Sequence, residues 1–126
     1  MGILITGGTG FTGAETARLL LQEGAEGLVL FDINTSTQRL DDLADLVEVR
    51  GGDLGNFSHV LEAVQRARPR TIYHLGGMLS LPSEDDPPAA FRANAMGTFH
   101  VLEAARLLGV EQVVFASTIG YLRTGY

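Results

Sequence analysis

The segment at residues 3–13, ILITGGTGFTG, constrains the fold of this chain more than any other. A short apolar run passes directly into four glycines, Gly7, Gly8, Gly10 and Gly13. Their positions satisfy two spacings at once, Gly-x-x-Gly-x-x-Gly and Gly-x-Gly-x-x-Gly. Such a turn between a strand and a helix lets a pyrophosphate approach bare backbone N–H groups at the helix N-terminus, where the dipole favours an anion. We expect a Cβ at Gly10 to intrude on the phosphates, and Gly13 to let the helix pack closely on the first strand.

The kind of nucleotide follows from what the loop lacks. A Walker-type loop for nucleoside triphosphates needs a lysine and a Ser or Thr after its last glycine. Every basic residue of this chain is an arginine, so that motif is excluded. The loop is therefore predicted to bind a dinucleotide, through Gly7, Gly10, Phe11, Thr12 and Gly13.

Asp32 closes the next strand-like run and follows Gly13 by 19 residues. Its carboxylate can accept both ribose hydroxyls of an adenosine and would repel a 2′-phosphate. Residues 33–37 contain no arginine to receive such a phosphate, so NAD(H) is favoured over NADP(H). Arg39 is the residue that would upset this preference if its loop folded back.

Short β-like runs alternate with helical periodicity along the chain. Strands are predicted at residues 2–6, 27–32, 46–50, 71–75 and 111–117, and helices at residues 11–24, 56–67 and 88–108. Residues 33–45 are polar with one short helical turn at 39–44, and residues 76–88 form a loop. Apolar strands separated by helices indicate a parallel sheet covered on both faces. We therefore predict one α/β domain over residues 1–126, a doubly wound Rossmann fold with strand order 3-2-1-4-5.

Composition narrows the partners and the location. The net charge is −6, and the only basic cluster is Arg66, Arg68 and Arg70, so nucleic-acid binding is disfavoured. No apolar stretch is long enough to span a bilayer, and residues 1–8 do not resemble a secretory signal. Without cysteine there is no disulfide framework, and no metal site is expected. A cytoplasmic location is the default expectation.

Six ordered segments carry a resemblance to a known family. They are TGGTGFTG, FDIN, GDL at residues 52–54, YHLGG at 73–77, NAMGTFHVLEAAR at 94–106 and VVFASTIGY at 113–121. Together they resemble the extended short-chain dehydrogenases/reductases, the group of NAD-dependent epimerases and dehydratases. The likeness covers the whole chain and is shared by the nucleotide-sugar epimerases and the threonine-dehydrogenase branch. Gly76 and Gly77 replace the alanines usual in the family.

The resemblance implies roles for further residues. Asp53 and Leu54 would flank the adenine, and Leu75, Gly76 and Gly77 would pass beside the cofactor. Asn34 and Asn94 join the cofactor-binding set, the latter by tying its helix to the neighbouring strand. Thr118, with Ser117 beside it, would orient the substrate oxygen, and Ser80 would touch the substrate. His74, which closes an apolar strand, is expected to be a packed structural histidine, as are His59 and His100.

The family's tyrosine-x-x-x-lysine pair, which handles the hydroxyl proton, is absent because Tyr121 is followed by LRTG and the chain has no lysine. We therefore expect the NAD(H)-binding portion of an epimerase, dehydratase or dehydrogenase that acts by hydride transfer on a nucleotide sugar or a 3-hydroxy amino acid. Its substrate-binding part would lie outside this chain, which would be inactive alone. The alternative is a stand-alone dinucleotide-binding module without catalysis. Apolar residues on two faces of the helix at 88–108 predict a homodimer through that helix.

Overall fold

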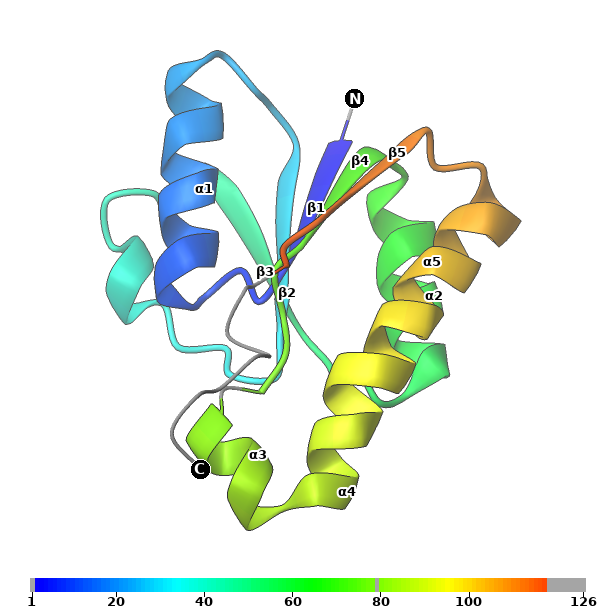
Figure 1. The fold of residues 1–126 in the computed structure, drawn as a ribbon. Helices are drawn as coiled ribbons and strands as arrows, with labels where there is room; N and C mark the ends of the chain where they lie inside the picture. The colour runs from blue at the N-terminus through cyan, green and yellow to red at the C-terminus, as the bar shows by residue number, and fades with distance from the viewer. Residues whose placement is uncertain (1, 79, 118–126) are drawn as a thin grey trace.

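A five-stranded parallel sheet forms the centre of the computed structural model, which describes residues 2–78 and 80–117 (Figure 1). The strands are Gly2–Thr6 (β1), Leu28–Asp32 (β2), Val47–Gly51 (β3), Pro69–His74 (β4) and Gln112–Phe115 (β5). Their order is β3-β2-β1-β4-β5, and every neighbouring pair is parallel. The predicted strand order is therefore confirmed.

Helices cover both faces of the sheet. Helix α1 (Phe11–Gln22) lies on one face, while α2 (Phe57–Ala67) and α5 (Gly97–Leu108) lie side by side on the other (Figure 1). A 3-10 turn, η1 (Gln38–Leu40), joins the α1 side. The segment after β4 forms α3 (Ser80–Asp85), α4 (Pro87–Ala90) and a π-helical stretch, η2 (Phe91–Met96). No helix within residues 2–78 and 80–117 is long and apolar enough to cross a bilayer.

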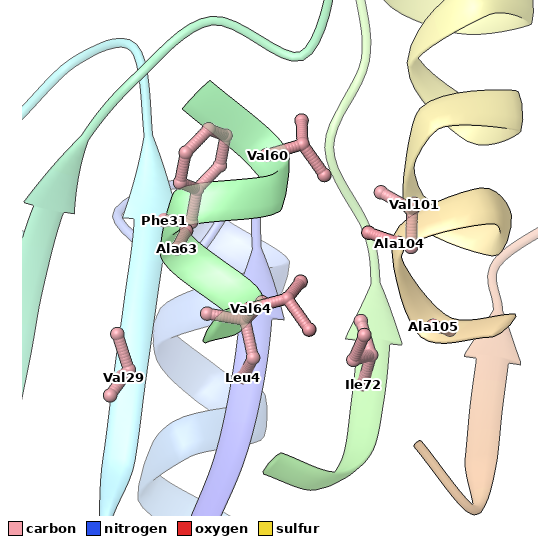
Figure 2. Close-up of a cluster of buried hydrophobic side chains, with 10 residues drawn as sticks. All are labelled: Leu4, Val29, Phe31, Val60, Ala63, Val64, Ile72, Val101, Ala104 and Ala105. Carbon is pink, nitrogen blue, oxygen red and sulfur yellow. The ribbon is translucent and has the colours of Figure 1, made fainter. Parts of the chain in front are cut away.

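Alternate residues of the strands feed two separate hydrophobic cores. On the α2 and α5 face, side chains of β1, β2 and β4 meet those of the two helices (Figure 2). The members of this cluster are Leu4, Val29, Phe31, Val60, Ala63, Val64, Ile72, Val101, Ala104 and Ala105. The opposite cluster consists of Ile5, Ala14, Ala17, Leu28, Leu30, Leu40 and Leu43. Because neighbouring strand residues point to opposite faces, burial on both sides requires the continuous apolar runs seen in the sequence.

The polar segment after β2 is held against α1 by one arginine. Arg18 donates to both carboxylate oxygens of Asp42, over 2.8 and 2.9 Å, and to the carbonyl of Arg39 over 3.1 Å. It also pairs with Glu15. The hydrogen bonds from Arg18 lower the pKa of Asp42. Leu40 and Leu43 are thereby kept in the core beneath a loop that is otherwise exposed.

The region between β4 and β5 differs from the prediction. The loop expected over 76–88 contains α3, and the single helix expected over 88–108 is divided into α4, η2 and α5. Asp86 caps α4 by accepting the N–H of Ala89 over 3.1 Å. In η2 the N–H of Gly97 bonds to the carbonyl of Arg92, five residues back, which defines a π turn. Helical periodicity in the sequence does not distinguish such a π turn from an α-helical one.

Strand β4 begins at Pro69, two residues before the predicted start, while β5 is shorter than predicted. Arg68 adopts a left-handed backbone conformation, with φ of 46°, and accordingly turns the chain from α2 directly into β4. Pro69 pairs with Gly2 at the first position of the strand, where proline is tolerated because it ends the ladder.

Candidate functional site

A cavity of about 540 Å³ lies at the carboxyl ends of β1, β2 and β4. This is where a doubly wound sheet reverses its strand order, since β1 has β2 on one side and β4 on the other. Predicted cofactor-binding residues line it: Gly7, Gly10, Phe11, Thr12, Gly13, Asp32, Asp53, Leu54, Leu75, Gly76 and Gly77. The sequence reasoning did not name the further lining residues Phe31, Ile33, Gly52, Met78, Ala89, Arg92 and Ala93. The structure thus brings nearly all the predicted set together around one space.

The glycine loop is folded tightly against itself. Gly7 has a φ of +68° and donates its N–H to the Phe31 carbonyl over 2.8 Å. A Cβ on Gly13 would stand 2.1 Å from the carbonyl oxygen of Gly7. Gly13 therefore permits close packing of α1 on the loop itself, a refinement of the expectation that it packs on the first strand.

Gly10 differs from its neighbours because it has space around it. It is the N-cap of α1, with φ of −76°, and a Cβ there would meet only the Gly7 oxygen at 3.4 Å. No side chain caps this helix end. The N–H groups of a first helical turn have no acceptor within the helix, so those of α1 are free to bind an anion.

Asp32 is oriented by two backbone groups. Its Oδ2 accepts the N–H of Thr9 over 3.2 Å, and its Oδ1 accepts the N–H of Asn34 over 3.1 Å. The Thr9 hydroxyl, which is buried, donates to the Asn34 carbonyl over 2.7 Å. Thr9 thus fastens the glycine loop to the end of β2, a role that its position between glycines did not reveal. Asn34 does not line the cavity; its Oδ1 accepts the N–H of Ser36 over 2.9 Å.

Arg39 does not line the cavity. Its side chain is exposed, and Arg18 binds its carbonyl, which fixes η1 against α1. The loop of Arg39 therefore does not bring this arginine to the cavity, where it could receive a 2′-phosphate and reverse the preference for NAD(H).

Two histidines support the wall formed by the loop after β3. The N–H of Asp53 donates to Nδ1 of His59 over 3.1 Å, and Nδ1 of His100 bonds to the Leu54 carbonyl over 2.7 Å. His100 is buried and its ring lies 5.4 Å from that of Phe57, as expected for a packed histidine. His59 is exposed, so the expectation that it is packed is wrong. A side chain at the start of a helix can reach the preceding loop without being buried.

Asn94 bridges η2 and the segment after β4. Its Oδ1 accepts the N–H of Met78 over 2.7 Å, and its Nδ2 donates to the Met78 carbonyl over 3.2 Å. It holds the cavity wall without lining the cavity. Ser117 follows β5 and is exposed, Ser80 is the first residue of α3, and Thr118 lies outside the described residues. The substrate-side assignments therefore stay predictions.

The parallel sheet, the glycine loop and the cavity at the switch point define a Rossmann-type nucleotide-binding fold. The model of the NAD dependent epimerase/dehydratase family matches residues 3–121, and the chain belongs to this family. The resemblance found in the sequence is thus confirmed.

Individual relatives share the family but are much longer. A UDP-glucose 4-epimerase of Rhizobium meliloti (strain 1021) is 30% identical over 117 residues, covering 92% of this chain and 35% of that protein. The crystal structure of the UDP-glucose 4-epimerase of Thermus thermophilus in complex with NAD has a TM-score of 0.83 and 33% identity, covering 94% of this chain and 38% of that one. L-threonine dehydrogenase from Clostridium difficile has a TM-score of 0.82 and 25% identity, with coverage of 94% and 36%. The chain thus spans little more than a third of these relatives.

Proposed function

We propose that this chain is the NAD(H)-binding portion of an NAD-dependent epimerase, dehydratase or dehydrogenase. The proposed substrate bears a hydroxyl, as in a nucleotide sugar or a 3-hydroxy amino acid. One observation carries the proposal: the switch-point cavity combines open space at Gly10, on a helix N-terminus, with an oriented carboxylate at Asp32. The relatives named above, one of them in complex with NAD, support it.

The cavity residues fit a dinucleotide in three zones. The glycine loop would hold the pyrophosphate, Asp32 the adenosine ribose, and the loop at Asp53 and Leu54 the adenine. Two large apolar side chains beside the cavity, Phe11 and Ile33, are 73% and 76% exposed, and a bound nucleotide would cover them. The segment from Leu75 to Gly77 would pass beside the cofactor, which supplies the hydride acceptor of the reaction. Thr118 and Ser117 are proposed to orient the substrate oxygen, and Ser80 to contact the substrate.

We expect the chain to bind NAD saturably and NADP at least about tenfold more weakly, because a 2′-phosphate would meet the Asp32 carboxylate. Replacing Asp32 with serine should lower the affinity for NAD by about 10-fold, the effect of losing one hydrogen bond to a charged group. It should also reduce the ratio of the affinities for NAD and NADP. Isothermal titration with NAD and NADP measures both effects.

Asp41→Ser is the matched control, since this exposed carboxylate lies beyond the cavity-lining residues and should leave both affinities unchanged. Equal affinity of the wild-type chain for NAD and NADP would contradict the role of Asp32. Absence of affinity for either dinucleotide would contradict the proposed function as a whole.

A second candidate is a stand-alone dinucleotide-binding module without catalysis. The observation that favours it is the lack of any lysine in these 126 residues, which excludes the tyrosine-x-x-x-lysine pair from them. A reading frame that continues past Tyr126 into such a pair would decide for the enzyme. Saturable NAD binding, without that continuation and without oxidation of a nucleotide sugar or threonine, would decide for the module. The cytoplasmic location stays a prediction, to be checked by cell fractionation.

We also propose that the chain forms a homodimer through the helical region from η2 to α5. Large apolar side chains on it are exposed, among them Phe91 at 62%, Phe99 at 57% and Leu102 at 51%. Several large apolar side chains exposed on one helical region are typical of an interaction site. Helix α5 already covers the sheet through Val101 and Ala104. The exposed side chains are not needed for that contact and are therefore available to a second copy of the chain.

The double variant Phe99→Ser, Leu102→Ser is expected to weaken dimerisation by at least about 30-fold, because two apolar side chains lose their burial. Sedimentation velocity over a concentration series measures the effect. Leu19→Ser on α1 is the control, since Leu19 is similarly exposed, at 59%, on the opposite face of the sheet. A wild-type chain that stays monomeric at high concentration would refute the dimer.

A further inference from the structure

A chain of hydrogen bonds, buried at Thr6 and His74, runs beneath the wall of the cavity that follows β4. Its first member is Thr6, at the end of β1, whose Oγ1 accepts the N–H groups of Leu75 and Gly76 over 3.1 and 3.0 Å. The same oxygen lies 2.6 Å from Nδ1 of His74. Nε2 of His74 lies 3.0 Å from Oγ1 of Thr98 on α5.

The donors in this chain can be assigned from the number of lone pairs. A hydroxyl oxygen has two acceptor positions and one proton. Oγ1 of Thr6 accepts the Gly76 N–H and shares the Leu75 N–H with the Thr6 carbonyl, which lies 3.2 Å from that nitrogen, so the hydroxyl proton is left for Nδ1 of His74. That nitrogen is therefore bare, and the neutral ring carries its proton on Nε2.

The assignment extends consistently to η2. The Nε2–H of His74 donates to Thr98, and the Thr98 hydroxyl donates to the carbonyl of Asn94 over 2.7 Å. Asn94 in turn binds both backbone groups of Met78. Every bond in the series from Thr6 to Met78 thus has one donor and one acceptor. Both ends of the series bind the backbone of residues 75–78.

The position of this segment matters because it touches the glycine loop. A Cβ on Gly7 would stand 2.8 Å from the Cα of Gly76, and a Cβ on Gly76 would stand 3.1 Å from the backbone nitrogen of Gly7. The backbones of Gly7 and Gly76 are thus packed directly against each other, with no room for a side chain between them. A displacement of the 75–78 segment would therefore displace the loop on which the phosphates are proposed to lie.

We propose that His74, as its neutral Nε2–H tautomer, is a positioning residue that sets residues 75–78 against the glycine loop and thereby shapes the dinucleotide site. The inference rests on the proposed function for the identity of the ligand, but its hydrogen-bond assignment does not. His74 does not line the cavity and is only 2% exposed, so any effect on the ligand must pass through the residues it positions.

The surroundings of His74 favour the neutral ring. The groups that face it in the described residues are Thr6 of β1, Thr98 of α5 and the Phe115 ring of β5, which stacks at 5.7 Å, and none of them is charged. Burial lowers the pKa of His74 below its ordinary value. Protonation at Nδ1 would also bring a third donor to Oγ1 of Thr6, beside the N–H groups of Leu75 and Gly76. The contribution of His74 to stability is therefore complete above its ordinary pKa and is lost as the pH falls through the lowered one.

The first test uses NMR of the wild-type chain without cofactor. Long-range ¹H–¹⁵N correlations of the imidazole should show that His74 is neutral and protonated on Nε2, and that it titrates below an ordinary histidine. An Nδ1–H tautomer would overturn the proposal, whether or not the chain binds a dinucleotide.

The second test measures NAD affinity in matched variants. Thr98→Val keeps the side-chain shape but removes both the acceptor of Nε2–H and the donor to the Asn94 carbonyl. We expect it to weaken NAD binding at least about 5- to 10-fold, the effect of losing one or more hydrogen bonds. Thr98→Ser keeps the hydroxyl and should bind NAD within about twofold of wild type. Both are compared at a temperature at which circular dichroism shows them fully folded.

The two proposals fail in different ways. If wild-type chain binds no dinucleotide, the proposed function fails, while the tautomer measurement still decides the hydrogen-bond assignment. If wild-type chain binds NAD and folded Thr98→Val binds it equally well, the positioning role of His74 is refuted and the proposed function stands.

Discussion

Replacement of Gly13 by alanine is expected to lower the free energy of unfolding by about 3 kcal/mol or more, the upper range for overpacking a closely packed site. The added Cβ would stand 2.1 Å from the Gly7 oxygen and 2.7 Å from the Cα of Gly8. Both are backbone atoms, so no side-chain rotation can relieve the contact. Either α1 moves away from the sheet or the glycine loop opens. Urea denaturation followed by circular dichroism measures the loss.

Gly24→Ala is the control for this substitution. Gly24 has a positive φ of +90°, but no atom lies within 4 Å of the Cβ that alanine would add. It should therefore cost only about 1 kcal/mol, the penalty for a left-handed backbone at a non-glycine residue. The difference between the variants isolates the steric contact at Gly13. Equal stability of Gly13→Ala and wild type would show that α1 does not pack on the loop as described.

The sheet and the cavity could be predicted because their determinants are local. The central strands β1 and β2 are apolar at nearly every position, which indicates burial on both faces and hence parallel pairing with helices on both sides. The glycine spacing marks the first crossover, and the carboxyl ends of parallel strands meet at one edge. Gly10 and Asp32 could consequently be assigned to one cavity from the pattern of the sequence, whereas Leu75 was assigned to it through the family resemblance.

The features that were missed depend on contacts between distant segments. Thr9 occupies a glycine-rich loop, where a hydroxyl is usually solvated, and only the return of the chain at Asn34 gives it a buried partner. Beside the π turn of η2, Thr98 and Asn94 bond to other elements of the fold. Neither local propensity nor periodicity contains that information. The prediction that His74 is a packed structural histidine is confirmed, since it is 2% exposed, but the sequence did not reveal its bonds to Thr6 of β1 and Thr98 of α5.

Replacement of Gly10 by alanine is expected to abolish dinucleotide binding while the fold is retained, whereas Gly13→Ala mainly lowers stability. Gly10 has φ of −76° and ψ of 178°, which alanine adopts freely, and the added Cβ would meet only the Gly7 oxygen at an ordinary 3.4 Å. Stability should fall by no more than about 1 kcal/mol, because alanine is a poorer N-cap than glycine. The methyl group would instead project into the cavity, where the pyrophosphate is proposed to lie on the N-terminus of α1.

Loss of two hydrogen bonds between backbone N–H groups and the phosphates would weaken NAD binding by about 100-fold or more. Calorimetric titration with NAD measures this, and urea denaturation of the same sample verifies the fold. Gly109→Ala provides the control, because Gly109 ends α5 away from the cavity and has no atom within 4 Å of an added Cβ. It should bind NAD like the wild type despite its positive φ. If Gly10→Ala binds NAD with wild-type affinity, the phosphates do not lie on this helix end. In that case the carboxylate of Asp32 would have to bind some other part of the ligand.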